Sequence, residues 1–308
     1  MVGDYAWDVL IRTNTALLPG GDTFGEVQLA PGGSAANAAV WAARCGLPAT
    51  FVGKVGRDRF GSLAEADLRN EGVEAYLVRT DAQLTGSVAV WIDHTGQRSM
   101  VSGKGADHAL FPQELPRPLL ATAEHLYLSA WALFDDPPRA AACEAARLVR
   151  DAGGTVSLDP GSFQMIEAMG VETFLDVTRS LRVQVLFPNV DEAAALSGTS
   201  DPAGMAERLA RLYPEALIAL KLDAEGAFLL EPDGTATAIP PQVNRLVDAT
   251  GAGDAFAGAF LSRWLRGVDA AEAARFAVEV SEWVIQHVGA RPPQDAELRR
   301  VLDAAVLA

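Results

Sequence analysis

The chain has 308 residues, 49% hydrophobic and 21% charged, which is enough apolar material for a large core in one or two domains. Its 25 basic and 40 acidic residues give a formal charge of −15, and because so acidic a surface repels phosphate backbones and anionic lipids, we exclude nucleic acid and membrane as expected partners. No apolar run approaches the roughly 18 residues of a membrane span, the acidic N-terminus is unlike a signal peptide, and two cysteines are too few for a disulfide framework, so we expect a cytoplasmic protein.

Short apolar runs alternate with alanine-rich stretches along the chain, a pattern typical of a mostly parallel sheet with crossover helices. We predict strands at Ala49–Val55, His125–Ser129, Thr155–Leu158, Val183–Phe187, Leu217–Leu222 and Ala227–Leu230. Helices are predicted at Ser34–Cys45, Arg139–Ala152 and Gly204–Leu212. No internal repeat or long linker interrupts this pattern.

Two early segments differ from the rest, approximately residues 9–31 and 84–103. They carry β-branched residues, turn glycines and polar alternation, with no obvious helix between strand pairs. We expect them to form a small β-sheet attached to the α/β body. The alternative is that they are edge strands of the main sheet.

Residues 247–256, which read VDATGAGDAF, are the most informative stretch. Aromatic side chains then recur every four residues, at Phe256, Phe260 and Trp264, which predicts a helix with one buried face. The triplet Gly251-Ala252-Gly253 would lie at the start of that helix, where converging backbone N–H groups and the helix dipole attract an anion. Asp254 would repel a static phosphate there, but it suits a base that takes the proton of a hydroxyl attacking a phosphoryl group. The alternative for Asp254 is a helix cap.

Residues 248–260, DATGAGDAFAGAF, resemble the signature of the ribokinase (PfkB) family of carbohydrate and nucleoside kinases, with Ala249 in place of a customary threonine. The resemblance implies that Asp254 is the catalytic base. It also implies that the backbone of Gly251, Ala252 and Gly253 forms the catalytic anion hole, and that Gly251 and Gly253 contact ATP. A potassium-type ion near Asp248 is a further implication, which the change at Ala249 leaves open.

The N-terminal third resembles the substrate-binding half of this family. Gly3–Asp8 is similar to an opening in which an aspartate at the end of the first strand holds two substrate hydroxyls, so the match implies this role for Asp8. Only Met1 and Val2 precede Gly3, so either that strand is unusually short or the true start lies upstream. The stretch PGGSAANAA at 31–39 and the lid tripeptide Gly-Gln-Arg at 96–98 imply further substrate contacts by Gly32, Gly33, Asn37 and Arg98.

The remaining motifs concern the nucleotide. Asn189 and Glu192 resemble the family's Asn-x-x-Glu, which supports Mg²⁺, usually through water, and the phosphates of ATP. At i and i+3 their oxygen ligands would share one helix face, although such a pair is also a common helix cap. Lys221 and Gly226, in LKLDAEGA at 220–227, resemble a nucleotide-binding segment and are implied ATP contacts. Asp159 ends a predicted strand at the ligand-facing edge of the sheet, where it is a channel residue or a plain turn residue.

The resemblance and the order of these motifs imply a single doubly wound α/β domain over residues 1–308, with the lid segments inserted in it. They also imply an ATP-dependent kinase acting on a hydroxyl, expected to be a primary alcohol, of a small carbohydrate such as ribose, fructose or a 2-keto-3-deoxy sugar acid. A nucleoside kinase on the same fold is the alternative. A catalytically idle sensor of nucleotide or sugar is a third possibility, which the intact Asp254 argues against. The resemblance also suggests a homodimer that pairs through the lid, while the oligomeric state and the acceptor stay open.

Overall fold

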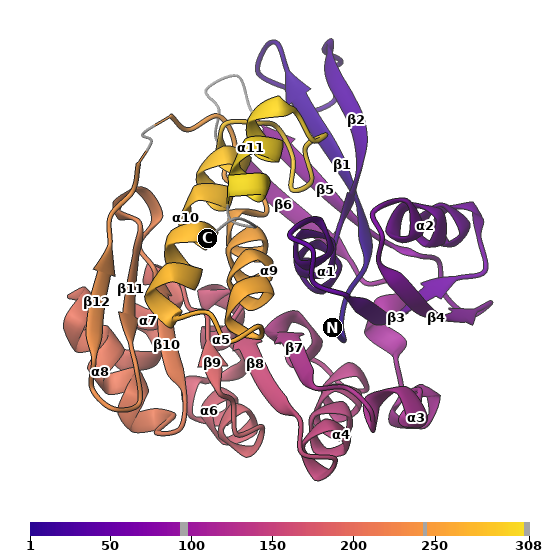
Figure 1. The fold of residues 1–308 in the computed structure, drawn as a ribbon. Coiled ribbons are helices and arrows are strands. Elements are labelled where there is room, and N and C mark those ends of the chain that lie inside the picture. Colours follow the sequence, from indigo (N-terminus) through magenta and orange to yellow (C-terminus); the bar gives the residue numbers. More distant parts are fainter. Residues whose placement is uncertain (93–97, 243–244, 305–308) are drawn as a thin grey trace.

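Two β-sheets organise the chain in the computed structural model, which describes residues 1–92, 98–242 and 245–304 (Figure 1). The larger sheet forms the body, and its strand order begins β12-β11-β10-β9-β8-β7. These strands span Ala236–Ile239 (β12), Ala227–Leu230 (β11), Leu217–Lys221 (β10), Val185–Leu186 (β9), Thr155–Asp159 (β8) and His125–Ser129 (β7). β7 to β10 are parallel and β11 and β12 antiparallel, so the predicted mostly parallel α/β sheet is confirmed.

Val2 joins this block to a second parallel pair, β3 (Thr50–Gly56) and β4 (Glu74–Thr80). It forms parallel bridges with Val52 on one side and Leu128 on the other. Before it enters the lid, the chain therefore contributes only a bridge, at Val2, to the body sheet. The chain turns out of the body directly afterwards and enters the second sheet at Ala6.

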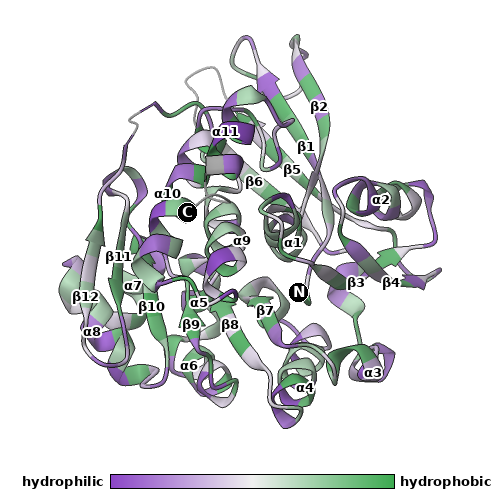
Figure 2. Ribbon diagram, viewed as in Figure 1, coloured by the Kyte–Doolittle hydropathy of each residue, from purple (hydrophilic) through white to green (hydrophobic). Residues whose placement is uncertain are grey.

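Two helix layers cover the body sheet, because its strands alternate their apolar side chains between the two faces. Leu126 and Leu128 of β7 pack with one layer and Tyr127 packs with the other. The first layer contains α3 (Arg117–Leu120), α4 (Pro138–Asp151), α5 (Phe163–Met169), α6 (Val171–Ser180), α7 (Val190–Ser197) and α8 (Pro202–Leu212). The second contains α1 (Ser34–Arg44), α2 (Arg59–Asn70), α9 (Ala252–Trp264), α10 (Ala270–Ile285) and α11 (Ala296–Ala304). Figure 2 shows the body strands mostly in the hydrophobic colour, as a sheet covered on both faces requires.

Short 3₁₀ turns complete the connections: η1 (Ala106–Ala109), η2 (Pro112–Glu114), η3 (Ala130–Ala132) and η4 (Asp223–Glu225). The predicted aromatic face of α9 is confirmed, since Phe256, Phe260 and Trp264 stack in sequence. α9 also packs closely on α1, and a Cβ on Gly258 would lie 2.7 Å from the carbonyl oxygen of Ala38. This close approach brings the first turns of the two helices together.

The smaller sheet has the order β2-β1-β5-β6 and projects from one side of the body (Figure 1). Its strands are β1 (Ala6–Thr13), β2 (Gly25–Gly32), β5 (Gly86–Ile92) and β6 (Arg98–Gly103). Within the part of the chain that the structure describes, these strands share no pairing with the body, so the lid prediction is confirmed and the edge-strand alternative is wrong. Among the described residues no helix has the length and apolar character needed to cross a bilayer.

Candidate active site

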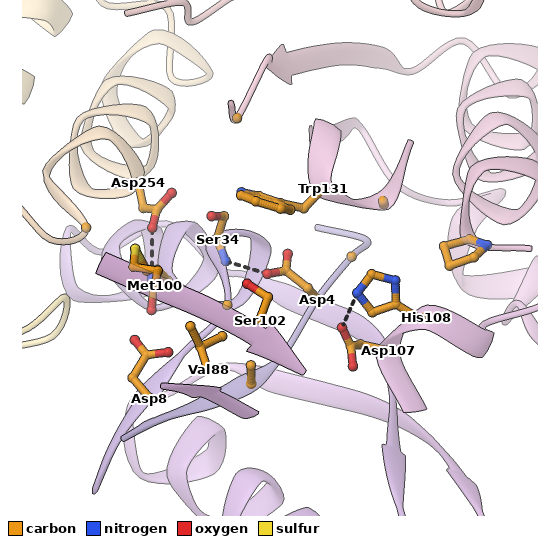
Figure 3. A pocket seen from close by; sticks show the side chains of 18 of the residues that line it. Asp4, Asp8, Ser34, Val88, Met100, Ser102, Asp107, His108, Trp131 and Asp254 are labelled. Atoms are coloured by element: carbon orange, nitrogen blue, oxygen red, sulfur yellow. Dashed lines mark hydrogen bonds and ion pairs between the residues drawn. The ribbon is translucent and has the colours of Figure 1, made fainter. Parts of the chain in front are cut away.

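A cavity of about 300 Å³ lies where the lid sheet faces the first turns of α1 and α9. Asp8, Val88 and Ser102 stand side by side in the register of three neighbouring lid strands and supply its wall on the lid side. Figure 3 shows Asp254 and Asp8 toward one end of this cavity, with His108 and Asp107 toward the other. Carboxylates from three separate elements therefore face one enclosed space.

The first turn of α9 forms one end of the cavity. Gly251 caps this helix at φ 76°, a left-handed conformation that favours glycine. A Cβ there would also lie 2.5 Å from the Cβ of Ala290. No side chain caps the helix. The N–H of Ala252 donates to the carbonyl oxygen of Ala249 at 3.3 Å, and the N–H of Gly253 lies beside it in the first turn, where helix N–H groups can bind an anion.

Asp254 stands in the same turn and reaches the cavity. Its Oδ2 accepts a hydrogen bond of 2.8 Å from Nδ2 of Asn37 in α1. Burial raises the pKa of Asp254 well above its ordinary value; the Asn37 hydrogen bond acts against that rise, and the nearby charge of Asp159 adds to it. A carboxyl group with a raised pKa is suited to accept a proton near neutral pH.

The predicted substrate residues of the N-terminal third meet at this cavity. Asp8, Gly33 and Asn37 line it directly, while Gly32 packs against the Asp8 carboxylate so closely that a Cβ would lie 2.5 Å from its Oδ2. One expectation is corrected: Asp8 is not at the end of a body strand, because the chain leaves the body after Gly3 and Asp8 lies within lid strand β1. Arg98 begins β6, but its side chain lies outside the described residues.

Of the predicted nucleotide residues, Lys221 lies beside the same helix start. Nζ of Lys221 lies 2.7 Å from Oδ2 of Asp159. A Cβ built on Gly253 would lie 3.0 Å from the same Nζ. Burial acts to lower the pKa of Lys221, but the carboxylates of Asp159 and Glu192 outweigh it and raise that pKa overall. A partly buried ammonium, with 13% of its side chain exposed, thus lies against the first turn of α9. Gly226 follows η4 at the start of the β10–β11 hairpin, outside the residues that line the cavity.

Asn189 and Glu192 form a capping box at the start of α7. The Asn189 side chain accepts from the Glu192 N–H at 2.8 Å, and the Glu192 carboxylate accepts from the Asn189 N–H at 2.9 Å. Glu192 is 2% exposed, and burial, together with the charge of Asp159, raises its pKa to about 7. In the structure this pair therefore makes the contacts of a helix cap. Among the described residues, no cluster of three or more His, Cys, Asp or Glu groups is arranged to hold a metal ion.

Asp248 ties two loops together behind the anion site. Its Oδ1 accepts from the N–H of Thr250 at 2.8 Å, and its Oδ2 accepts from the N–H of Gly289 at 2.9 Å. These bonds fix the loop before α9 against the loop after α10. The cation predicted near Asp248 stays a prediction.

Sequence reasoning missed several residues of the site. Asp4 accepts hydrogen bonds from the N–H groups of Ser34 and Ala35 at the start of α1. Asp107 and His108, 3.4 Å apart, line the far end of the cavity, and the buried Arg291 contacts Asn37. Asp4 lies inside the opening motif and could have been found there. The other three carry no sequence signal, because the fold alone brings them together.

The sequence pattern of the pfkB family carbohydrate kinases matches residues 2–297. Among curated proteins, the ATP-dependent ribose-1-phosphate kinase of Halopiger xanaduensis is 31% identical over 96% of this chain and 94% of its own length. The aminoimidazole riboside kinase of Salmonella typhimurium is 34% identical over 75% of this chain and 72% of its own.

Solved structures agree with these relatives. The adenosine kinase of Sinorhizobium meliloti superposes with a TM-score of 0.85 at 26% identity, covering 99% of this chain and 97% of its own. The ribokinase of Arabidopsis thaliana, solved with ribose and ATP, has a TM-score of 0.80 at 25% identity and covers 98% and 97%.

The chain belongs to the PfkB family of carbohydrate kinases. It is therefore an ATP-dependent phosphotransferase with an alcohol group as acceptor, on a ribokinase-like α/β fold with a β-sheet lid.

Proposed function

We propose that this protein transfers the γ-phosphoryl group of ATP to a hydroxyl of a small uncharged carbohydrate, with Asp254 as the base. The observation that carries the proposal is the position of Asp254 between the anion site of α9 and the cavity beneath the lid. The acceptor hydroxyl would lie in that cavity beside Asp254. Its oxygen would attack the terminal phosphorus, the bond to the β-phosphate oxygen would break, and ADP would leave.

Each of these residues would have a separate role in the transfer. Asp254 takes the hydroxyl proton, while the N–H groups of Ala252 and Gly253 stabilise negative charge on the transferring phosphoryl group. Asp8 and Asn37 orient the acceptor through its other hydroxyls. Closure of the lid would exclude water, which would otherwise accept the phosphoryl group and hydrolyse ATP.

The nucleotide would bind on the Lys221 side of α9. Lys221 contributes the buried positive charge, and Gly226 and Asn189 would contact the nucleotide at the ends of β10 and β9. Glu192 offers oxygen donors to Mg²⁺, but both of its oxygens already accept from Asn189, so it would hold the ion through water. Bound Mg²⁺ supplies positive charge beside the β- and γ-phosphates. A monovalent cation near Asp248 would further order the anion site.

The charges around the cavity favour an acceptor without an anionic group. Asp4, Asp8, Asp107 and Asp254 line it, and no lysine or arginine does so among the lining residues that the structure describes. A phosphate or carboxylate on the acceptor would find no cationic side chain among these lining residues, and each ionised carboxylate among them would repel it. We therefore place neutral pentoses and hexoses ahead of sugar acids, and ahead of the ribose-1-phosphate that gives the Halopiger relative its name.

A nucleoside acceptor is the second candidate, and the far end of the cavity favours it. Trp131 offers an aromatic surface between Asp254 and His108, and Asp107 and His108 offer hydrogen-bonding groups at the end of the cavity opposite Asp8 (Figure 3). A base linked to ribose would fill this end. The names of the Salmonella riboside kinase and the Sinorhizobium adenosine kinase are consistent with it.

A homodimer through the lid is the assembly we propose. The lid sheet has a second face, turned away from Asp8 and the cavity. Four apolar residues stand side by side on it as partners on neighbouring strands: Leu29, Val9, Ala89 and Val101. Leu29 and Val101 are exposed, and so is Val27 in the next row. An apolar sheet face of this kind is suited to burial against a second copy.

The test is ADP release over a panel of pentoses, hexoses, sugar acids, sugar phosphates and nucleosides. We expect turnover with neutral sugars or nucleosides and at least 10³-fold less in Asp254→Asn, because proton removal would be lost. ATP binding, followed by calorimetry, should be nearly unchanged in that variant. Asp176→Asn, at a side chain 80% exposed on α6, is the matched control and should equal the wild type. Near-normal turnover by Asp254→Asn would refute the assignment of the base.

A further inference from the structure

A chain of buried hydrogen bonds continues behind Asp254, away from the cavity. Nε of Arg291 donates to Oδ1 of Asn37 at 2.6 Å, and Nδ2 of Asn37 donates to Asp254 at 2.8 Å. Arg291 is 9% exposed and is not among the residues that line the cavity. It follows α10 in the C-terminal segment and is distant in sequence from both of its partners.

Arg291 is itself held on three further sides. Nη1 donates to Oδ2 of Asp67 at 2.6 Å, Nη2 donates to the carbonyl oxygen of Gly32 at 3.1 Å, and the guanidinium lies over the ring of Tyr5 at 5.5 Å. The hydroxyl of Tyr5 also donates to Asp67. A guanidinium has several N–H donors in a fixed planar arrangement, so these contacts set its position and leave Nε directed at Asn37.

This contact determines which way the Asn37 amide faces. An arginine can only donate, so the amide must present its oxygen to Arg291 and its NH₂ to Asp254. Without Arg291 the amide is free to turn, and in the turned orientation its oxygen would face the carboxylate and repel it. The hydrogen bond to Asp254 therefore depends on a residue that touches neither Asp254 nor the cavity.

We propose that Arg291 is a positioning residue for the phosphoryl transfer: it fixes the Asn37 amide so that the NH₂ group supports Asp254, and it anchors the Gly32 carbonyl in the acceptor-binding turn. The inference rests on the proposed role of Asp254 as the base. It accounts for the ion pair of Arg291 with Asp67, whose side chains are 1% and 18% exposed, at a place where a pair of apolar side chains would stabilise the fold equally well.

The consequence is measurable as a change in the titration of Asp254. A donor to the ionised form lowers a carboxyl pKa, so loss of the correctly placed NH₂ should raise the pKa of Asp254 further. Other groups also act on Asp254: Asp159 and Lys221 from the body strands, and Asp4 from the segment before β1. The hydroxyl of Tyr127 on β7 is coupled to it as well. None of these groups is altered by a change at Arg291.

The experiment compares Arg291→Met with Arg44→Met. Arg44 is an equally buried arginine that donates to the carbonyl of Pro292, in the same C-terminal segment, and pairs with Glu71, but it does not touch Asn37. In the Arg291 variant we expect the acid limb, where kcat/KM rises as Asp254 loses its proton, to shift to a pH about one unit higher. At pH values below this limb kcat/KM should be about tenfold lower than in the wild type, and at pH values above it mostly restored. In the Arg44 variant the limb should stay at the wild-type pH.

A second readout does not need an acceptor. The Asp254 carboxyl is titrated by ¹³C NMR in aspartate-labelled protein, and Asp254→Asn supplies the assignment. If the wild type phosphorylates no acceptor, the proposed function fails, while this titration still decides the role of Arg291.

An unchanged Asp254 titration in folded Arg291→Met would overturn the inference, as would a loss of activity that is equal at all pH values, which is what a structural role alone produces. If Arg291→Met does not fold, Arg291→Met/Asp67→Asn carries the same test, because it leaves no unpaired carboxylate at Asp67.

Discussion

Replacing Asp107 by asparagine should make the protein more stable at alkaline pH. Asp107 is buried at the far end of the cavity, its Oδ1 has no hydrogen-bond partner among the described residues, and Asp4 lies near enough to act on it. Burial first, and then the charge of Asp4, raise its pKa from the ordinary 3.8 to about 7. Asparagine has nearly the same shape and no charge to bury.

The size and sign of the effect follow from linkage. Between pH 4 and pH 7 the folded protein holds a proton on Asp107 that the unfolded chain has released, so folding stability falls as the pH rises through this window. A shift of about three pH units corresponds to about 4 kcal/mol in total. About 3 kcal/mol of that is lost between pH 5 and pH 8, and the loss should be absent from Asp107→Asn.

The assay is urea unfolding of the wild type and Asp107→Asn at pH 5 and pH 8, followed by circular dichroism. The informative quantity is a double difference in the free energy of unfolding: Asp107→Asn minus wild type at pH 8, less the same difference at pH 5. Any effect of the new asparagine side chain on its neighbour Gly86 that does not depend on pH cancels in this subtraction. We expect about 3 kcal/mol in favour of asparagine. Asp81→Asn, at a side chain 79% exposed, should give a value near zero. Parallel stability profiles for the wild type and Asp107→Asn would refute the reasoning.

Two further changes test other parts of the molecule. Lys221→Met should lower the free energy of unfolding by about 3–5 kcal/mol, because Asp159 is left buried without its partner. Adding Asp159→Asn should restore most of this stability, as measured by urea unfolding. ADP release should not recover in the double variant, since the positive charge beside the anion site is still missing. Val27→Asp on the outer lid face should shift the protein from dimer to monomer in light scattering, whereas the same change at the exposed Leu63 of α2 should not; a wild type that is monomeric at every concentration contradicts the dimer proposal.

Local patterns were sufficient to predict most of the fold. The predicted strands at 125–129 and 227–230 match β7 and β11 residue for residue, and the predicted start of α1 is correct. The predicted strand at 183–187 was too long, because only Val185–Leu186 pairs with its neighbours. These elements are set by short-range alternation and by glycine stops, which a single sequence displays directly.

The lid boundary was harder to predict, because it depends on where the chain leaves the body sheet. Residues before Ala6 and after it are both apolar, so composition does not separate Val2, bridged in the body, from the lid strand that contains Asp8. The tertiary pairing of β1 with β5 decides the matter. This is why Asp8 was expected at the end of a body strand and is found in the lid.

The supporting residues of the site lay beyond sequence reasoning for a different physical reason. Asn37 and Asp254 could be read from motifs, because each lies in the first turn of a helix that starts with glycine. Arg291 is 254 positions from Asn37, and its contact depends on how α9 packs against both α1 and α10. No local pattern encodes a pairing of that range.

The net charge of −15 becomes consistent with an ATP-binding protein once the positions of the charges are known. Acidic side chains line the cavity that we propose for the acceptor, whereas the proposed anion site is built from backbone N–H groups of α9 and the partly buried Lys221. Backbone amides contribute nothing to the net charge, so the count of acidic and basic residues does not register this attraction. The two ligands of the proposed reaction would thus enter environments of opposite polarity that meet at Asp254. The same separation should keep an anionic nucleotide out of the acceptor cavity and a neutral acceptor away from Lys221.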